Sequence, residues 1–362
     1  MALIGGTFGR YFAARSFKAM AGVFLTVCVL IYTVDFVELM RRASEAPTAG
    51  ALTMAKLALF RTPSVTEQVL PFAVLFGAMA AMLNLSRKLE LVVTRSAGVS
   101  VWQFLQPPIL VALLIGVFMV GVYNPLSATL KQRATEIEAV IFGKGARALG
   151  QETWIRQKSP DGQAIIRAMA ANSDGTTLTE VTAFVFSTDG SFLERVEAKQ
   201  ATLKDRFWEM SDVRIVSADN PPATHATYKL ATNLKAEQVR QSFVPPASVP
   251  FWSLPTLIEQ TRQAGLDANR YELQYQTLLA KPLLLVAMVI IASTVSLRFF
   301  RMGGVARMVL GGVSAGFVLY VVRQLVEDLG ANGLLSVTAA AWTPAAVAAL
   351  TGAFILLHLE DG

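Results

Sequence analysis

Apolar residues gather in six long segments, three before and three after a polar middle of the chain. The polar middle, Asn124 to Gln276, holds no apolar run long enough to cross a bilayer. A helix needs about 20 residues to cross the hydrocarbon, and each apolar segment is about that long. The segments are residues 19–40, 65–85, 101–123, 278–297, 305–326 and 339–357. The pattern predicts two membrane halves of three helices each, with one polar domain inserted between them.

The first and third segments carry local signals of their own. Residues 3–15 form a short amphipathic stretch with Arg10, Arg15 and aromatic side chains, which is typical of a helix along the membrane interface. The first apolar segment is full length and has no small-residue cleavage site after it, so we interpret it as a retained helix. In the third segment, Pro107 and Pro108 remove two backbone donors and predict a break or kink.

In the polar middle, apolar side chains alternate with polar ones, as in half-buried strands. The stretch TLTEVTAFVFSTDGSFLERVEAKQATL predicts two strands joined at Asp189 and Gly190. The stretch ATLKDRFWEMSDVRIVS predicts another pair that turns near residues 204–206. We therefore expect an all-β domain, built as a sandwich or an open barrel.

The helical period returns from Leu254 onward. The sequence LPTLIEQTRQAGLDANRYELQYQTLLAKP predicts a helix to about Ala264, a break at Gly265, and a second helix that enters the fourth apolar segment. The inserted domain is therefore expected to be tied rigidly to both membrane halves.

Composition agrees with a membrane protein. The chain is 53% hydrophobic and 16% charged, with a mean hydropathy of +0.47, which is too apolar for an ordinary soluble protein. Its net charge of +6 resides in basic residues at the ends of apolar segments, so it indicates a cytoplasmic membrane face rather than nucleic-acid binding. Cys28 is the only cysteine and excludes an internal disulfide.

Lys and Arg in the short connections predict the orientation. The side that carries both termini has nine: Arg10, Arg15, Lys18, Arg87, Lys88, Arg95, Arg298, Arg301 and Arg307. The other side has four: Arg41, Arg42, Lys56 and Arg61. We expect both termini in the cytoplasm and the inserted domain exported, to the periplasm if the host is a Gram-negative bacterium. Arg41 and Arg42 then lie on the outer side, against the general rule.

The residues needed for common catalytic sites are missing. His225 and His358 are the only histidines, and the chain has no H-E-x-x-H zinc motif, no phosphate-binding loop of the G-x-x-x-x-G-K-[ST] type and no G-x-S-x-G elbow. We expect a protein that is not an enzyme by itself and holds no cofactor.

The loop between the second and third segments, SRKLELVVTRSAGVS, predicts a short amphipathic helix at about residues 86–98. Gly98 is placed to end this helix and Ser100 to cap the next one. Two interpretations are open: an interfacial helix with a solvated charged face, or a docking element for a cytoplasmic partner. Its apolar side is Leu85, Leu89, Val92 and Val93, and its polar side is Arg87, Glu90, Thr94 and Arg95.

The run LPFAVLFGAMAAMLNLSRKLELVVTRSAGVS resembles the P-F-A-x-L-x-G…S-E-L-V-V-x-R-A-x-G-x-S signature of the YjgP/YjgQ family, the LptF and LptG permease subunits of the lipopolysaccharide exporter. FVELMRRA, GLDANRYELQYQTLLAKPLLLVAM and GGVSAGFVLYVV resemble the LptG branch. The chain departs from the family at Leu89, where Ser or Asn is usual, and at Arg323, where an acidic or neutral residue is expected.

The resemblance implies an α+β membrane protein with a periplasmic β-jellyroll. The domains would be residues 1–123, 124–253 and 254–362. The partners would be LptF, a cytoplasmic LptB dimer that carries ATP and Mg²⁺, the single-span LptC and the LptA bridge. Lipopolysaccharide would enter a cavity between the two permeases in the inner membrane, and ATP-driven closure would push it toward the jellyrolls.

The resemblance also assigns site residues. It implies that the helix at 86–98 couples to the ATPase, with Glu90 at the acidic position and Leu89, Val92 and Val93 in an apolar groove, flanked by Arg87 and Arg95. Four further residues are substrate-binding candidates. Guanidinium groups bind phosphate well, so Arg41 and Arg42 are candidates for lipid phosphates. Asp35 and Arg323 lie at similar depth and are expected to face the cavity or a partner helix, with a direct pair as one possibility.

Three other classes remain open from the residues: an LptF-like paralogue, the permease of another lipid or lipoprotein ABC exporter, and a membrane-anchored scaffold. A scaffold needs only one span, and a different ABC permease usually carries its exported domain after the first span. Association with an ATPase separates both permease classes from the scaffold.

Overall fold

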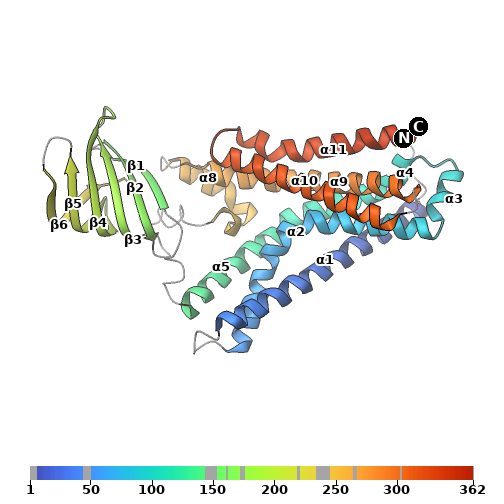
Figure 1. Ribbon diagram of the computed structural model, residues 1–362, viewed down its shortest axis with the longest axis horizontal. Helices are drawn as coiled ribbons and strands as arrows, with labels where there is room; N and C mark the ends of the chain where they lie inside the picture. Colours follow the sequence, from blue (N-terminus) through green and yellow to red (C-terminus); the bar gives the residue numbers. More distant parts are fainter. Residues whose placement is uncertain are drawn as a thin grey trace.

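Long helices form one body, and a curved antiparallel sheet lies beyond one end of it (Figure 1). This computed structural model describes residues 6–43, 50–142, 153–159, 162–171, 176–217, 221–233, 245–263, 267–301 and 304–361. Within them, six helices are long and apolar enough to cross a membrane. The predicted three-plus-three arrangement around an inserted β domain is confirmed.

The first span is longer than predicted. Helix α1 (Gly6–Ala43) runs without interruption through the stretch expected to form a separate interfacial helix. That expectation is wrong because the apolar side of the stretch is covered by protein: Phe12 is buried against Met82 and Leu85 of α2 (Ala51–Arg87). Helix α2 likewise starts before the predicted residue 65.

The third span also extends past its predicted end. Helix α4 (Val101–Phe118) continues through a π-helical turn, η1 (Met119–Tyr123), into α5 (Asn124–Ile141). Pro107 and Pro108 lie inside α4, and the irregular turn comes later, at η1. Residues 124–141 are therefore helical and do not belong to the β domain, because Pro125 fits the first turn of a helix.

Six strands form one sheet in the order of the sequence, each antiparallel to the next. They are β1 (Thr153–Ser159), β2 (Gly162–Ala171), β3 (Thr177–Phe186), β4 (Phe192–Lys204), β5 (Phe207–Ser217) and β6 (Ala223–Ala231). Both predicted hairpins are confirmed, with left-handed φ angles of 88° at Gly190 and 63° at Arg206. The described strands thus form a meander, because each strand pairs only with its neighbours in the sequence. A jellyroll would also pair strands that are not consecutive in the sequence.

The sheet curls until its first and last strands share a buried contact. Gln157 of β1 donates to the Ala231 carbonyl of β6 at 3.1 Å and accepts from the Trp208 indole of β5 at 3.2 Å. The Thr232 hydroxyl also donates to Gln157, at 2.7 Å. Trp208 and Ile166 are fully buried inside the curl. Of the two predicted forms, the open barrel describes this sheet.

The second membrane half begins where the chain returns from the sheet. Two short 3-10 turns, η2 (Pro246–Ser248) and η3 (Phe251–Ser253), lead into α8 (Leu254–Gln263). The spans α9 (Asn269–Arg301), α10 (Val305–Ala331) and α11 (Val337–Asp361) follow. The predicted helix, break and second helix agree with α8 and α9, although Gly265 lies outside the described residues.

The two halves pack against each other through α2 and α9. Leu75 and Met79 of α2 share the largest core cluster with Leu285 and Met288 of α9. The start of α1 and the end of α11 lie together at the end of the bundle away from the sheet (Figure 1). This arrangement gives the bundle two distinct ends.

Candidate functional site

A short helix, α3 (Glu90–Ser96), lies at the bundle end away from the sheet (Figure 1). The predicted helix of residues 86–98 is shorter in the structure, since Arg87 ends α2 and Leu89 has a left-handed φ of 61° that interrupts the helical path. Gly98, with φ of 83°, follows α3, and Ser100 caps α4 through a capping box with Gln103, as predicted.

Helix α3 has one covered and one uncovered side. Leu91 and Thr94 are buried at 5% and 6% exposure, and Leu91 packs in a cluster with Phe12 and Leu85. Leu89 and Val93 are 60% and 64% exposed. The predicted apolar side is thus divided, with Leu85 in the core and Leu89 and Val93 at the surface.

The Glu90 carboxylate faces α1. The Tyr11 hydroxyl donates to its two oxygens at 3.0 and 3.2 Å, and the Arg15 guanidinium lies 3.9 Å away. Arg15 also donates to Asn84 of α2 at 2.9 Å. Arg87 is exposed, and the side chains of Val92 and Arg95 lie outside the described part. Glu90 therefore ties α3 to the first span.

A second charged group lies where α1, α2 and α5 approach the sheet. Arg61 of α2 lies between Asp35 of α1, at 3.3 Å, and Glu138 of α5, at 2.5 Å. Arg41 and Arg42 end α1 and both bind Glu38, at 2.9 and 3.0 Å. Their side chains remain 76% and 56% exposed, so both guanidinium groups are accessible to a ligand.

Asp35 and Arg323 do not pair. Asp35 binds Arg61, and Arg323 binds Glu327 one turn further along α10 at 2.7 Å. The direct pair, which the sequence left as one possibility, is not formed because each residue has an opposite charge on its own or the neighbouring helix.

Sequence reasoning missed a buried ion pair between the two halves. Lys281 of α9 lies 2.6 Å from Glu67 of α2, with side-chain exposures of 8% and 11%. Asn124 donates to the same carboxylate at 3.0 Å. Both charges lie in long apolar segments, where ionisable residues are rare and mark functional positions, so the signal was present in the sequence.

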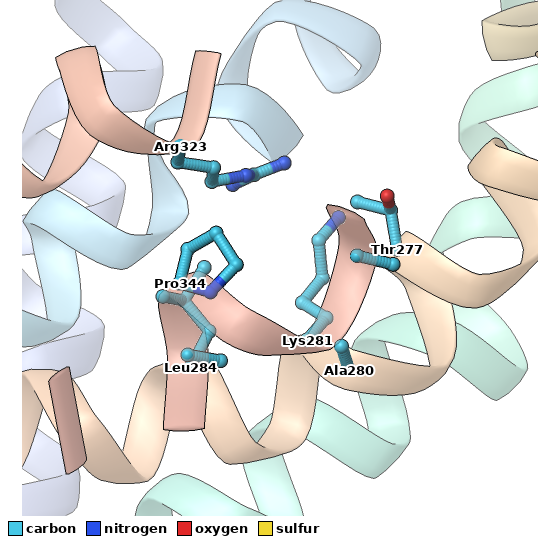
Figure 2. Close-up of a pocket in the computed structure, with 8 residues that line it drawn as sticks. Thr277, Ala280, Lys281, Leu284, Arg323 and Pro344 are labelled. Atoms are coloured by element: carbon cyan, nitrogen blue, oxygen red, sulfur yellow. The ribbon is translucent and has the colours of Figure 1, made fainter. Parts of the chain in front are cut away.

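A cavity of about 10 Å³, room for about one water molecule, adjoins Lys281. Figure 2 shows Lys281 and Thr277 on one side of it and Arg323 and Pro344 on the other. Arg323 of α10 thus lines the same cavity as Lys281 of α9 and Pro344 of α11.

An open groove of about 520 Å³ lies between α1 and α4. Phe17 of α1 and Leu114 and Phe118 of α4 line it, and Arg10 supplies a cation. Most of its lining side chains are apolar, and they come from two helices that are long and apolar enough to cross a membrane. Among the described residues, no group of three or more His, Cys, Asp or Glu side chains is arranged to hold a metal ion.

Comparison with known families decides the class. The model of the lipopolysaccharide export system permease LptF/LptG family matches residues 10–358, nearly the whole chain. The chain belongs to this family. It is 22% identical to the lipopolysaccharide export system permease protein LptG of Haemophilus influenzae, over 88% of this chain and 89% of that protein. It is 21% identical to LptG of Escherichia coli K12, over 90% of each chain.

The LptF/LptG match confirms the resemblance found in the signature run and the similarity to LptG in particular. The six spans of the bundle agree with membership in a family of permease subunits. In this LptF/LptG chain, the candidate residues fall at two ends of one bundle. Glu90, Leu89 and Val93 lie at the α3 end, and Arg41 and Arg42 lie at the sheet end.

Proposed function

We propose that this chain is the LptG-like permease subunit of an exporter that moves lipopolysaccharide out of the inner membrane, driven by ATP hydrolysis on a separate cytoplasmic subunit. The observation that carries the proposal is the placement of an exposed apolar docking element, α3, and a curved β sheet at opposite ends of one six-span bundle (Figure 1). A subunit that links ATP hydrolysis on one side to lipid transfer on the other needs both.

The proposed orientation places the α3 end and both termini in the cytoplasm. Arg10, Arg15, Lys18, Arg87 and Lys88 gather at that end, and an excess of cations marks the cytoplasmic face. The sheet then lies in the periplasm. Exposed apolar side chains on the sheet, Trp154, Met169 and Phe192, support a role in passing acyl chains onward, because a lipid can cover them.

The proposed partners follow from the two ends. At the cytoplasmic end, Leu89 and Val93 insert into an apolar groove of an LptB dimer, which carries ATP and Mg²⁺, while this chain needs no cofactor. LptF pairs with this chain in the membrane, and LptC and the LptA bridge receive the lipid beside the sheet. Arg41 and Arg42, at the end of α1, contact lipid phosphates, for which guanidinium groups are suited.

A pull-down followed by intact-complex mass measurement tests this assembly. We expect one copy of this chain, one homologous six-span chain and two ATPase subunits. Reconstitution of that complex in liposomes that contain lipopolysaccharide should give ATP-dependent transfer of the lipid to the bridge protein. A complex without an ATPase, or one that transfers phospholipid and leaves lipopolysaccharide behind, would contradict the proposal.

A further inference from the structure

We propose that Glu67, Asn124 and Lys281 form a positioning junction that carries movement of α3 to the segments entering and leaving the β domain. This inference rests on the proposed function, since it assigns residues that link ATP-driven movement to lipid transfer. The junction is defined by these three side chains.

One carboxylate holds the junction together. Glu67 of α2 accepts from Lys281 of α9 at 2.6 Å, and from Asn124 at 3.0 Å through one oxygen and 3.3 Å through the other. The Asn124 side-chain oxygen in turn accepts from the Phe251 backbone N–H at 3.0 Å. Asn124 starts α5, which leads toward the sheet, and Phe251 lies in η3, on the way back. The contacts therefore join both membrane halves and both connections to the β domain.

Each of the three helices has an irregularity in its backbone hydrogen bonding close to its junction residue. Pro71 of α2 lacks the N–H that would donate to the Glu67 carbonyl in a regular helix, and Pro282 directly follows Lys281 in α9. Asn124 directly follows the π-helical turn η1. Proline and π-helical turns are the usual places at which helices bend, and π-helical turns are frequent at functional sites. Three such points meet at one buried carboxylate.

The helices next to the junction touch through their backbones. A Cβ atom on Gly116 of α4 would lie 2.5 Å from the Pro282 Cα of α9, so only glycine allows this approach. Helices α4 and α9 cannot move closer together at this level. Because Glu67 lies on α2 and Lys281 on α9, the distance between their side chains changes only when α2 bends or moves relative to α9.

The far end of α2 leads to α3. About 20 residues separate Glu67 from Arg87, which corresponds to roughly 30 Å of helix. Only the turn at Lys88 and Leu89 lies between the end of α2 and α3. Because α2 packs along α9 over much of its length, displacement of α3 reaches the junction as a movement of α2.

A purely stabilising role is a poor explanation for the pair. Removing two charges from water offsets most of their attraction, so an apolar pair of similar volume is often as stable as a buried ion pair. In a membrane, such charges are retained at functional positions. Replacing both charges with methionine should therefore leave the fold intact while removing the directional contact that positions the two halves.

The decisive experiment compares the double variant Glu67→Met/Lys281→Met with the wild-type chain, each reconstituted with its partner permease and ATPase in liposomes containing lipopolysaccharide. The readout is lipopolysaccharide transferred per ATP hydrolysed, normalised to the amount of assembled complex. Glu67→Gln is the conservative variant. Gln276→Leu is the matched control, because Gln276 accepts from Trp342 at 3.1 Å within the second half alone.

We expect the double variant to assemble and hydrolyse ATP, but to transfer roughly five- to tenfold less lipopolysaccharide per ATP, with Glu67→Gln intermediate and Gln276→Leu unchanged. Transfer per ATP equal to wild type would overturn the junction and leave the proposed function standing. If Glu67→Gln and the double variant both failed to assemble, the Glu67–Lys281 pair would have a structural role, and the junction would likewise be overturned. A wild-type complex that transfers no lipopolysaccharide would instead overturn the proposed function, and with it the junction.

Discussion

The Tyr11 hydroxyl of the first span donates a hydrogen bond to the Glu90 carboxylate of α3, 79 residues further along the chain. The proposed ATPase-coupling helix is thus held by α1 as well as by its direct connections to α2 and α4. Any ATPase residue that binds Glu90 must share the carboxylate with Tyr11 and Arg15.

Charge reversal at Glu90 should uncouple the complex. Glu90→Lys places a cation beside Arg15, which lies 3.9 Å from the carboxylate, and removes a contact worth about 1.5–3 kcal/mol for a charged hydrogen bond. We expect weaker ATPase association or ATP hydrolysis without export, measured by co-purification and lipopolysaccharide transfer. Tyr11→Phe is the control, because it removes the local hydrogen bond and keeps the carboxylate.

A compensating charge reversal on the ATPase should restore part of the activity of Glu90→Lys. Normal export by Glu90→Lys with the wild-type ATPase would show that α3 is only an interfacial helix.

Two apolar side chains of α3 should respond differently to the same substitution. Val93→Ser changes an exposed side chain, so the unfolding temperature should stay constant while binding to the ATPase weakens. Leu91→Ser changes a buried one and should destabilise the chain by about 2–4 kcal/mol. Thermal unfolding in detergent and co-purification separate the two effects. Equal ATPase binding by wild type and Val93→Ser would remove the docking role of this surface.

The arginines at the end of α1 should affect the substrate and not the assembly. Arg41→Ala/Arg42→Ala leaves Glu38 exposed to solvent, where the loss of these pairs has little effect on stability. We expect less photo-crosslinking of lipopolysaccharide to the first span. Arg262→Ala on α8, which breaks the exposed pair with Glu272, is the control and should not change crosslinking. Undiminished crosslinking in the double variant would mean that the arginines are only membrane anchors.

Arg61 should stabilise the arm formed by α1, α2 and α5. Arg61→Met leaves Asp35 and Glu138 facing each other without a cation, and we expect a loss of about 1–3 kcal/mol, discounted for partial solvent exposure. The measurement is thermal unfolding in detergent micelles, with Arg61→Lys as a control that keeps the charge. If Arg61→Met unfolds at the wild-type temperature, the bridge contributes nothing to the arm.

Gln157 should keep the sheet curled. Gln157→Leu is close in size but removes the hydrogen bonds to Trp208, Thr232 and Ala231. Leaving the buried Trp208 indole N–H without its Gln157 acceptor costs about 1–3 kcal/mol before relaxation. We expect Trp208 to become accessible to an aqueous quencher, measured by fluorescence with the other four tryptophans replaced by phenylalanine. Gln200→Leu, a glutamine-to-leucine change at an exposed position of β4, is the control. Unchanged quenching would mean that apolar packing alone holds the curl.

Features that depend on residues close together in the chain could be predicted from the sequence. Hydropathy placed all six spans, because crossing the hydrocarbon is a property of one segment at a time. Alternation and turn residues placed the hairpins at Gly190 and Arg206, and Gly98 and Ser100 marked the end of one helix and the start of another. These signals act over a few residues, so tertiary packing did not change them.

Contacts between groups far apart in the chain depend on how the helices pack. Glu67 and Lys281 are 214 residues apart, and their pairing depends on how α2 crosses α9. Packing likewise gave Asp35 and Arg323 separate partners and directed Glu90 toward Tyr11. Helices α1 and α5 also extend beyond the boundaries that hydropathy predicted. These amphipathic stretches stay helical because α2 covers their apolar side chains. Which charges pair is set by contacts between segments, so the pairing has no local signature even where the charges themselves stand out in an apolar segment, as Glu67 and Lys281 do.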